Sequence, residues 1–192
     1  MEFIKAYKPA TNSFSSGQVL QEPYTVRKAR VVVREMAESA ALDLLDKRMV
    51  TDQLVLTIGY DTASLSNEDA RTTYKGEVTT DYYGRKVPKH AHGTANLESP
   101  TSSARLISEA VMELFDRIVN PKLLVRRINL TTNHVVDEET AAKNPSPVQY
   151  DLFTDYEALE RKQREEKERL AKERQIPVSY THLRAHETLM NL

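Results

Sequence analysis

The sequence predicts an α+β fold in which a four-stranded, mainly antiparallel sheet carries two helices on one face. Two segments repeat apolar residues at spacings of three and four, which is typical of amphipathic helices. Short stretches rich in β-branched residues lie before and after each of them, which is typical of strands. The resulting order, βαββαβ, is a split-βαβ arrangement. It leaves the second face of the sheet open, and we look for functional residues there.

The first half of the chain is expected to supply two strands and a helix. Residues 1–17 are polar and rich in turn formers, so they are expected to be a linker, and Gln18–Gln21 is expected to be a short strand. Residues 25–47 have the strongest helical period, with Thr25 as a plausible N-cap. Gln53–Tyr60 (QLVLTIGY) has the composition of a strand.

The second half repeats this pattern after a long loop. Residues 62–86 show no helical period, and a hairpin is expected around Tyr82, Tyr83 and Gly84. We expect a strand at Lys89–Leu97, with its glycine at a bulge or a close approach. A helix is predicted over 101–119, capped by Thr101 or Ser102, and the last strand at Leu124–Val136.

Composition excludes several classes of protein. The 192 residues include no cysteine, so disulfide frameworks, thiolate metal sites and cysteine nucleophiles are ruled out. No apolar run or signal sequence indicates a membrane protein or an exported one, so we expect a cytoplasmic protein. We also expect it to be a monomer. The net charge of −1 argues against a wholly basic nucleic-acid binder, but the first 150 residues are neutral and could carry a local basic face.

Several separated segments together resemble the C-terminal part of UmuC/ImpB/MucB-type Y-family DNA polymerases, which carry out translesion synthesis. They are Lys5–Leu20 (KAYKPATNSFSSGQVL), the helix with VVVREM, the strand QLVLTIGYD, the block VPKHAHGTANL and the strand LLVRRINLTTNHV. The similar region is the domain called the little finger, and we assign it to residues 18–137. The resemblance implies that this chain is a fragment, not active by itself. The palm and its metal-binding carboxylates would lie elsewhere, so this chain needs no cofactor, whereas the intact polymerase would use Mg²⁺.

The resemblance implies that the open sheet face grips primer-template DNA, mainly through phosphates. Arg126 and Arg127 occupy the position of the paired arginines on the last strand of the family pattern, so the resemblance makes both candidate DNA-binding residues. Neighbouring strand residues point to opposite faces, and by polarity Arg127 with Asn129 and Thr131 is the better DNA-side set. The alternative for the arginines is an ordinary salt bridge at a strand edge. The remaining candidate DNA-binding residues are the basic stretch before and within the preceding strand and the serines near the start: Arg85, Lys86, Lys89, His90, His92, Ser13, Ser15 and Ser16.

His90 and His92 also support a second hypothesis, that of a metal site. Two imidazoles at positions i and i+2 of a strand can bind one metal ion, with His134 as a further ligand. No acidic residue or cysteine lies near them in the sequence, so we favour half-exposed strand residues and expect no metal site.

Residues 138–153 are expected to be a linker that carries a clamp-binding peptide. The sequence QYDLF (Gln149, Tyr150, Asp151, Leu152, Phe153) is similar to the QL(S/D)LF peptide of bacterial polymerases, with Tyr150 where leucine is commoner. Such a peptide inserts its last two apolar side chains into a pocket of the sliding β-clamp. The alternative is that Leu152 and Phe153 attach the following segment to the core.

Two segments follow this peptide. Residues 154–176 are expected to form a charged helix with few apolar anchors. In the last segment, 177–192, the stretch PVSYTHLRAHET resembles the translation of a sequencing adapter, so we expect a non-native tail that does not pack on the core.

Three functions remain open from the sequence. The first is the DNA-binding little finger of a translesion polymerase. The second is a non-catalytic ferredoxin-like module for protein or ligand binding, because this fold serves many functions. The third is a metal enzyme that uses His90 and His92.

Overall fold

The computed structural model describes residues 12–66 and 74–143, together with 161, 164, 165 and 168–172 of the tail. Its main feature is a four-stranded sheet in the order β1-β6-β2-β5, and all three strand pairs are antiparallel. The predicted fold class is therefore confirmed. The elements are β1 (Asn12–Tyr24), α2 (Val26–Asp46), β2 (Met49–Tyr60), η1 (Thr62–Leu65), β3 (Val78–Thr80), β4 (Lys86–Pro88), β5 (Ala91–Thr101), α4 (Ala104–Ile118), β6 (Val125–Asp137) and α5 (Glu138–Lys143).

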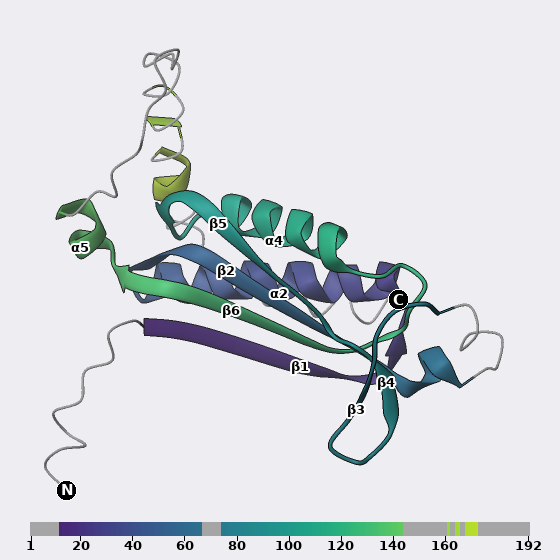
Figure 1. The fold of residues 1–192 in the computed structure, drawn as a ribbon. Helices are drawn as coiled ribbons and strands as arrows, with labels where there is room; N and C mark the ends of the chain where they lie inside the picture. Colours follow the sequence, from purple (N-terminus) through teal and green to yellow (C-terminus); the bar gives the residue numbers. More distant parts are fainter. Residues whose placement is uncertain (1–11, 67–73, 144–160, 162–163, 166–167, 173–192) are drawn as a thin grey trace, which may run out of the picture.

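Helices α2 and α4 lie side by side on one face of the sheet, as Figure 1 shows. Between them and the sheet lies an apolar core, in which Phe115 is the largest fully buried side chain. Burial of each such side chain contributes roughly 1.5–3 kcal/mol to folding. The alternate residues Leu54, Leu56 and Ile58 of β2 face this core, so the residues between them face away from it.

Close packing of α4 on β5 depends on Gly93. A Cβ atom at this position would lie 2.8 Å from both Leu114 Cδ1 and Ile118 Cγ2. The glycine expected at a bulge or a close approach therefore marks a close approach, and it lets the second helix sit directly on the edge strand.

Both helices match their predictions, with one difference at a cap. The hydroxyl of Thr25 accepts the N–H of Lys28 at 3.5 Å, so Thr25 caps α2 as expected. Helix α4 begins later than expected, with Ser103 as its N-cap in place of Thr101 or Ser102. The hydroxyl of Thr101 instead accepts the backbone N–H of Ser103 at 3.0 Å, which fixes the turn into the helix.

Strand β1 is much longer than the predicted Gln18–Gln21. It begins at Asn12 and pairs with β6 along most of its length, so Ser13, Ser15 and Ser16 lie within the sheet and not in a linker before it. An edge strand with one neighbour keeps most of its side chains in solvent, so it lacks the apolar alternation by which strands are recognised.

The predicted hairpin around Tyr82–Gly84 is confirmed as a separate two-stranded unit, formed by β3 and β4. Lys86 therefore belongs to this hairpin, and β5 begins at Ala91, after Lys89 and His90. The strand expected over Lys89–Leu97 is thus shifted, because Pro88 and its neighbours pair with β3 instead.

The C-terminal segments lie largely outside the described residues. Those described between 161 and 172 are helical, which agrees with a charged helix there. The clamp-binding peptide at 149–153 and the tail at 177–192 lie outside the described part of the chain. Among the residues described, no helix is long and apolar enough to cross a membrane.

Candidate nucleic-acid interface

The sheet face opposite the helices, here called the open face, is formed by residues that alternate with the core residues. Directly opposite residues of an antiparallel pair point to the same side, so the register assigns each strand's contribution. Gly59 of β2 pairs with Arg127 of β6, and Thr57 pairs with both Asn129 and His92. The side chains of the open face are those of Ser15, Val19, Gln53, Val55, Thr57, His92, Thr94, Asn96, Arg127, Asn129, Thr131 and Asn133.

Arg127 is the exposed cation of the open face. It lies between Val19 of β1 and Gly59 of β2, and Gly59 presents no side chain that could cover it. Among the residues that the structure describes, none forms a hydrogen bond or ion pair with the Arg127 guanidinium. All its donors are therefore available to an external anion.

Arg126 is engaged elsewhere. Its Nη1 donates a hydrogen bond to the carbonyl oxygen of Gln21 at 2.7 Å, and its Nε lies 3.7 Å from Asp61 Oδ2. These contacts tie the end of β1 to the turn after β2. The structure thus separates the neighbouring arginines, with Arg126 in a structural contact and Arg127 on the open face.

Polar groups on β1 and β6 form a small hydroxyl and amide cluster. The hydroxyl of Ser15 donates to Asn129 Oδ1 at 3.2 Å and lies 3.0 Å from the hydroxyl of Thr131. Ser16 pairs with Leu130, so it points toward the helix side at the exposed edge. The structure therefore brings Ser15, Asn129 and Thr131 together, but not Ser16.

Two further polar links cross the strands of the open face. His92 Nδ1 lies 2.9 Å from the hydroxyl of Thr57. The Asn133 amide donates to Gln53 at 3.0 Å, and Gln53 in turn donates to Asn96 at 3.0 Å, so one chain of amides spans β6, β2 and β5. These links hold the polar side chains in place, and their free donors remain directed at solvent.

The basic residues before β5 lie on or beside the hairpin. Lys89 forms an ion pair with Glu77 at 2.7 Å, and Arg85 forms one with Asp81 at 2.7 Å. Lys86 donates to the hydroxyl of Thr80 at 3.1 Å. His90 is exposed and lies directly before Ala91, the first residue of β5.

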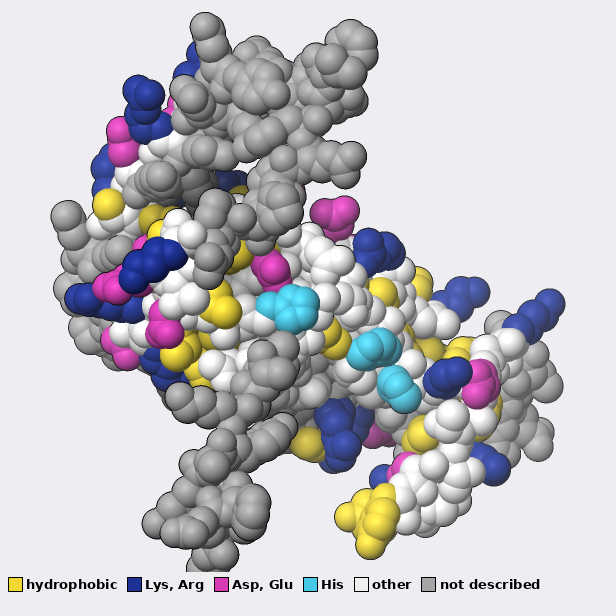
Figure 2. Space-filling model, turned by 60° about the vertical axis from the view of Figure 1, so that its left-hand side comes forward, with side chains coloured by type: hydrophobic (Ala, Val, Ile, Leu, Met, Phe, Trp, Pro, Cys, Tyr) yellow, Lys and Arg dark blue, Asp and Glu magenta, His cyan; other side chains and the backbone are white. Residues whose placement is uncertain are grey.

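Charge is unevenly distributed along the open face. Arg127, His92 and the hairpin lie at one end of the sheet, whereas Asp52 and Glu98 lie toward the other end of β2 and β5. Asp52 there contacts His134 Nδ1 at 2.8 Å. Figure 2 shows histidines on a surface made mostly of neutral polar groups and backbone. An anionic ligand is therefore attracted most strongly at the Arg127 end.

The histidines do not converge on one point. His134 lies at the opposite end of the sheet from His92, and His90 lies outside the strand. Within the described ranges, no group of three or more histidine and acidic side chains is placed to hold a metal ion.

Comparison with known protein families identifies the family of this chain. Residues 11–146 match the model of the impB/mucB/samB family C-terminal domain. The chain belongs to that family. It is accordingly the little finger domain of a Y-family polymerase, as the sequence resemblance indicates. The match includes every strand of the main sheet and ends just before the QYDLF peptide.

A search of solved structures finds the complex of a beta-clamp processivity factor and the little finger domain of PolIV. The match has a TM-score of 0.41 and 8% sequence identity, and it covers 74% of this chain and 100% of that one. No curated protein matches the chain.

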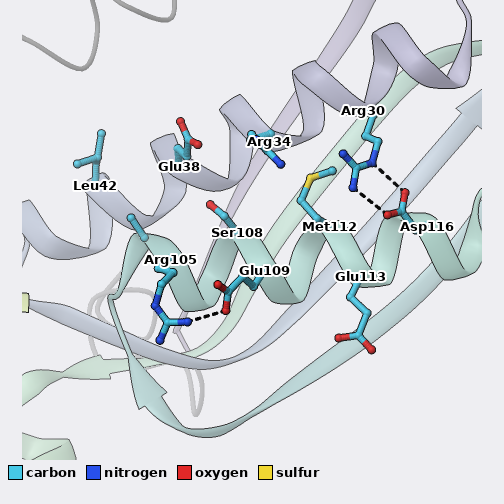
Figure 3. Close-up of a pocket in the computed structure, with 11 residues that line it drawn as sticks. Arg30, Arg34, Glu38, Leu42, Arg105, Ser108, Glu109, Met112, Glu113 and Asp116 are labelled. Carbon is cyan, nitrogen blue, oxygen red and sulfur yellow. Dashed lines mark hydrogen bonds and ion pairs between the residues drawn. The ribbon is translucent and has the colours of Figure 1, made fainter. Parts of the chain in front are cut away.

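The helix side of this little finger has a different character. A groove between α2 and α4 is shown in Figure 3, and it is lined by charges of both signs, some of which pair with one another. Arg30 forms a two-pronged ion pair with Asp116, at 2.9 and 3.0 Å, and Arg105 pairs with Glu109 at 2.7 Å. Because carboxylates of α4 and α2 lie among its arginines, this side is a poor surface for a polyanion.

Some residues of the open face were predicted from the sequence, and others were not. Sequence reasoning found Arg127, Asn129, Thr131, Ser15 and His92, which the register places on that face. It missed the contribution of β2, Gln53 and Thr57 among them. The signal was present in QLVLTIGY, where polar residues alternate with Leu54, Leu56 and Ile58.

Proposed function

We propose that this little finger holds primer-template DNA on its open face by contacts to the phosphate backbone. The observation that carries the proposal is the Arg127 guanidinium, which has no partner among the described residues and lies on an open antiparallel face. Neutral donors of Ser15, Asn129 and Thr131 lie beside it, and the central part of the face carries no carboxylate. Arginine and small neutral donors are the groups that proteins use on phosphates.

Contacts of this kind do not read sequence, which suits a polymerase that crosses damaged template. Phosphate contacts set the register and orientation of a protein on DNA, whereas base edges carry the sequence information. The sheet face offers no projecting helix to enter a groove, and several of its polar side chains are hydrogen-bonded to one another. We therefore infer that the domain binds different sequences equally.

The test compares the adjacent arginines in the complete chain. Fluorescence anisotropy with labelled primer-template DNA should show weaker binding by Arg127→Ala and a fall of about one in the slope of log affinity against log salt. Arg126→Ala removes the same charge from the next residue, so it is the matched control and should leave the salt slope nearly unchanged. Equal effects of both variants, or none at low salt, would refute the proposal for Arg127.

We further propose that the peptide Gln149–Phe153 tethers the polymerase to the sliding clamp. The support is its similarity to bacterial clamp-binding peptides and its place directly after the family domain, which ends at residue 146. In the proposed complex, Leu152 and Phe153 fill an apolar pocket of the clamp, and Gln149 forms a hydrogen bond at the edge of that pocket. We expect a cytoplasmic monomer whose partners are DNA and the clamp.

A further inference from the structure

The hairpin of β3 and β4 ends in a rigid turn. The Asp81 carboxylate accepts the backbone N–H groups of Tyr83 and Arg85 at 3.0 and 2.9 Å, and the Arg85 guanidinium at 2.8 Å. The backbone closes the same turn, because the N–H of Asp81 donates to Arg85 and that of Gly84 donates to Asp81. Gly84 takes a positive φ of 78°, which favours glycine. The side chains at this tip therefore stand on a fixed frame.

Two tyrosines at the tip are left almost entirely in solvent. Tyr82 is 97% exposed and Tyr83 is 77% exposed, and their rings meet edge to face at 5.4 Å. The Arg85 guanidinium lies 5.3 Å from the centre of the Tyr83 ring. The hairpin projects from the body of the domain as an arm (Figures 1 and 2). Tyrosine is enriched at interfaces, and exposed apolar groups that lie together often mark interaction sites.

The charge of the hairpin selects the kind of ligand. Arg85 and Lys89 are balanced by Asp81 and Glu77, whereas Lys75 and Lys86 have no acidic partner among the described residues. An excess of cations around exposed rings is the arrangement that binds single-stranded nucleic acid, because phosphates meet the cations and bases stack on the rings. The hairpin also leads directly into β5, at the Arg127 end of the open face.

We propose that Tyr82 and Tyr83 stack on unpaired bases of the DNA strand that extends beyond the duplex held on the open face. This proposal rests on the proposed DNA binding of the open face and adds a second, distinct contact. The sheet holds paired DNA by its phosphates, and the tyrosine arm holds the neighbouring single strand by its bases. Stacking accepts any base, since every base has an aromatic face.

The experiment uses the complete chain and two labelled DNAs, a blunt duplex and the same duplex with a single-stranded thymine extension. The double variant Tyr82→Ala/Tyr83→Ala should bind the extended DNA at least about fivefold more weakly, which is the smallest effect expected from losing one base stack. Its affinity for the blunt duplex should be unchanged. The double variant Tyr82→Phe/Tyr83→Phe keeps the rings and should bind both DNAs normally.

Val78→Ala is the matched control, because it shortens another exposed apolar side chain, 42% exposed, on the same hairpin. Unchanged binding of the extended DNA by the variant Tyr82→Ala/Tyr83→Ala would overturn the proposal. A loss of affinity for a sliding clamp by the same variant would not rescue it. An equal loss for both DNAs would also overturn it. Failure of the sheet contact gives a different result, because Arg127→Ala would then leave the affinity for the blunt duplex unchanged.

Discussion

At the residue scale, Arg126 and Arg127 should separate stability from DNA binding. Arg126→Ala removes a hydrogen bond to Gln21 and a partly exposed ion pair with Asp61, so it should lower the free energy of unfolding by about 1 kcal/mol. Arg127→Ala removes no contact within the described residues and should change that free energy by less than about 0.5 kcal/mol. Urea unfolding of both variants measures the difference, and a larger loss from Arg127→Ala would contradict the assignment.

Gly93 is the second position where one side chain has a large predicted effect. Gly93→Ala places a methyl group against the side chains of Leu114 and Ile118, so these side chains or the helix itself must shift. We expect a loss of about 1–3 kcal/mol in the free energy of unfolding, which is typical of overpacking. Thr94→Ala changes the adjacent residue on the open face and should cost less than about 0.5 kcal/mol. Equal unfolding midpoints for these variants would show that α4 adapts.

The sequence pattern predicted which of the two arginines lies on the open face, but it did not predict which of them has a hydrogen-bond partner within the protein. Alternation along LVRRINLTT sets Arg127 beside Asn129 and Thr131, as the register shows. The contact of Arg126 with Gln21 joins residues far apart in the chain, and no local pattern encodes it. The start of β5 was predicted two residues too early for a similar reason, because Pro88 pairs with Val78 in the hairpin and β5 begins only at Ala91.

At the element scale, the ion pair between α2 and α4 should make stability depend on pH. The hydrogen bond and charge of Arg30 hold the pKa of Asp116 below its ordinary value. A carboxyl with a lowered pKa stabilises the fold above its ordinary pKa, and this contribution is lost as the pH falls through the lowered value. Asp116→Asn should therefore flatten the acid limb of a plot of unfolding free energy against pH.

The size of that effect should be small, because both side chains are about half exposed. Exposed pairs typically contribute less than about 1 kcal/mol. Arg105→Ala is a suitable comparison, since it removes a cation from an ion pair within α4 and leaves the link between the helices intact. An acid limb unchanged by Asp116→Asn would show that the helix pair does not depend on this contact.

The helices, each of which buries one apolar face, were predicted well from the sequence. Strand β1, at the edge of the sheet, was not. The two helices show their apolar period in sequence and were located to within a few residues. Strand β1 was recognised only over Gln18–Gln21. Its N-terminal half is held mainly by backbone hydrogen bonds to β6, which any sequence can make, so the side chains reveal little about it.

At the scale of the whole molecule, the DNA and clamp contacts should be independent. Replacing both Leu152 and Phe153 by alanine should abolish binding to a sliding clamp, because the two side chains that we propose fill its pocket are lost. The same variant should bind primer-template DNA normally, and Arg127→Ala should bind the clamp normally. Surface plasmon resonance on immobilised clamp tests both statements. Clamp binding that survives the alanine pair would leave the peptide without its proposed role.

The net charge of the chain does not predict where an anion could bind, because the two sides of the sheet carry different charges. Acidic and basic groups balance along the helix side, while the central open face holds neutral donors and Arg127. A total of −1 therefore conceals one surface that can accept phosphates. Composition alone could not show this, since it records how many charges are present and not where they lie.

The pairing of Asn12 with Val135 has a mechanical consequence. The chain enters the sheet at Asn12 and leaves it at Asp137, so both connections join the sheet at the end away from Arg127. Tension between the two connections acts on a single antiparallel pair from its outer end. It would unzip β1 from β6 one hydrogen bond at a time and would not shear all of them together. A weak pull could thus detach β1 while the other three strands stay paired.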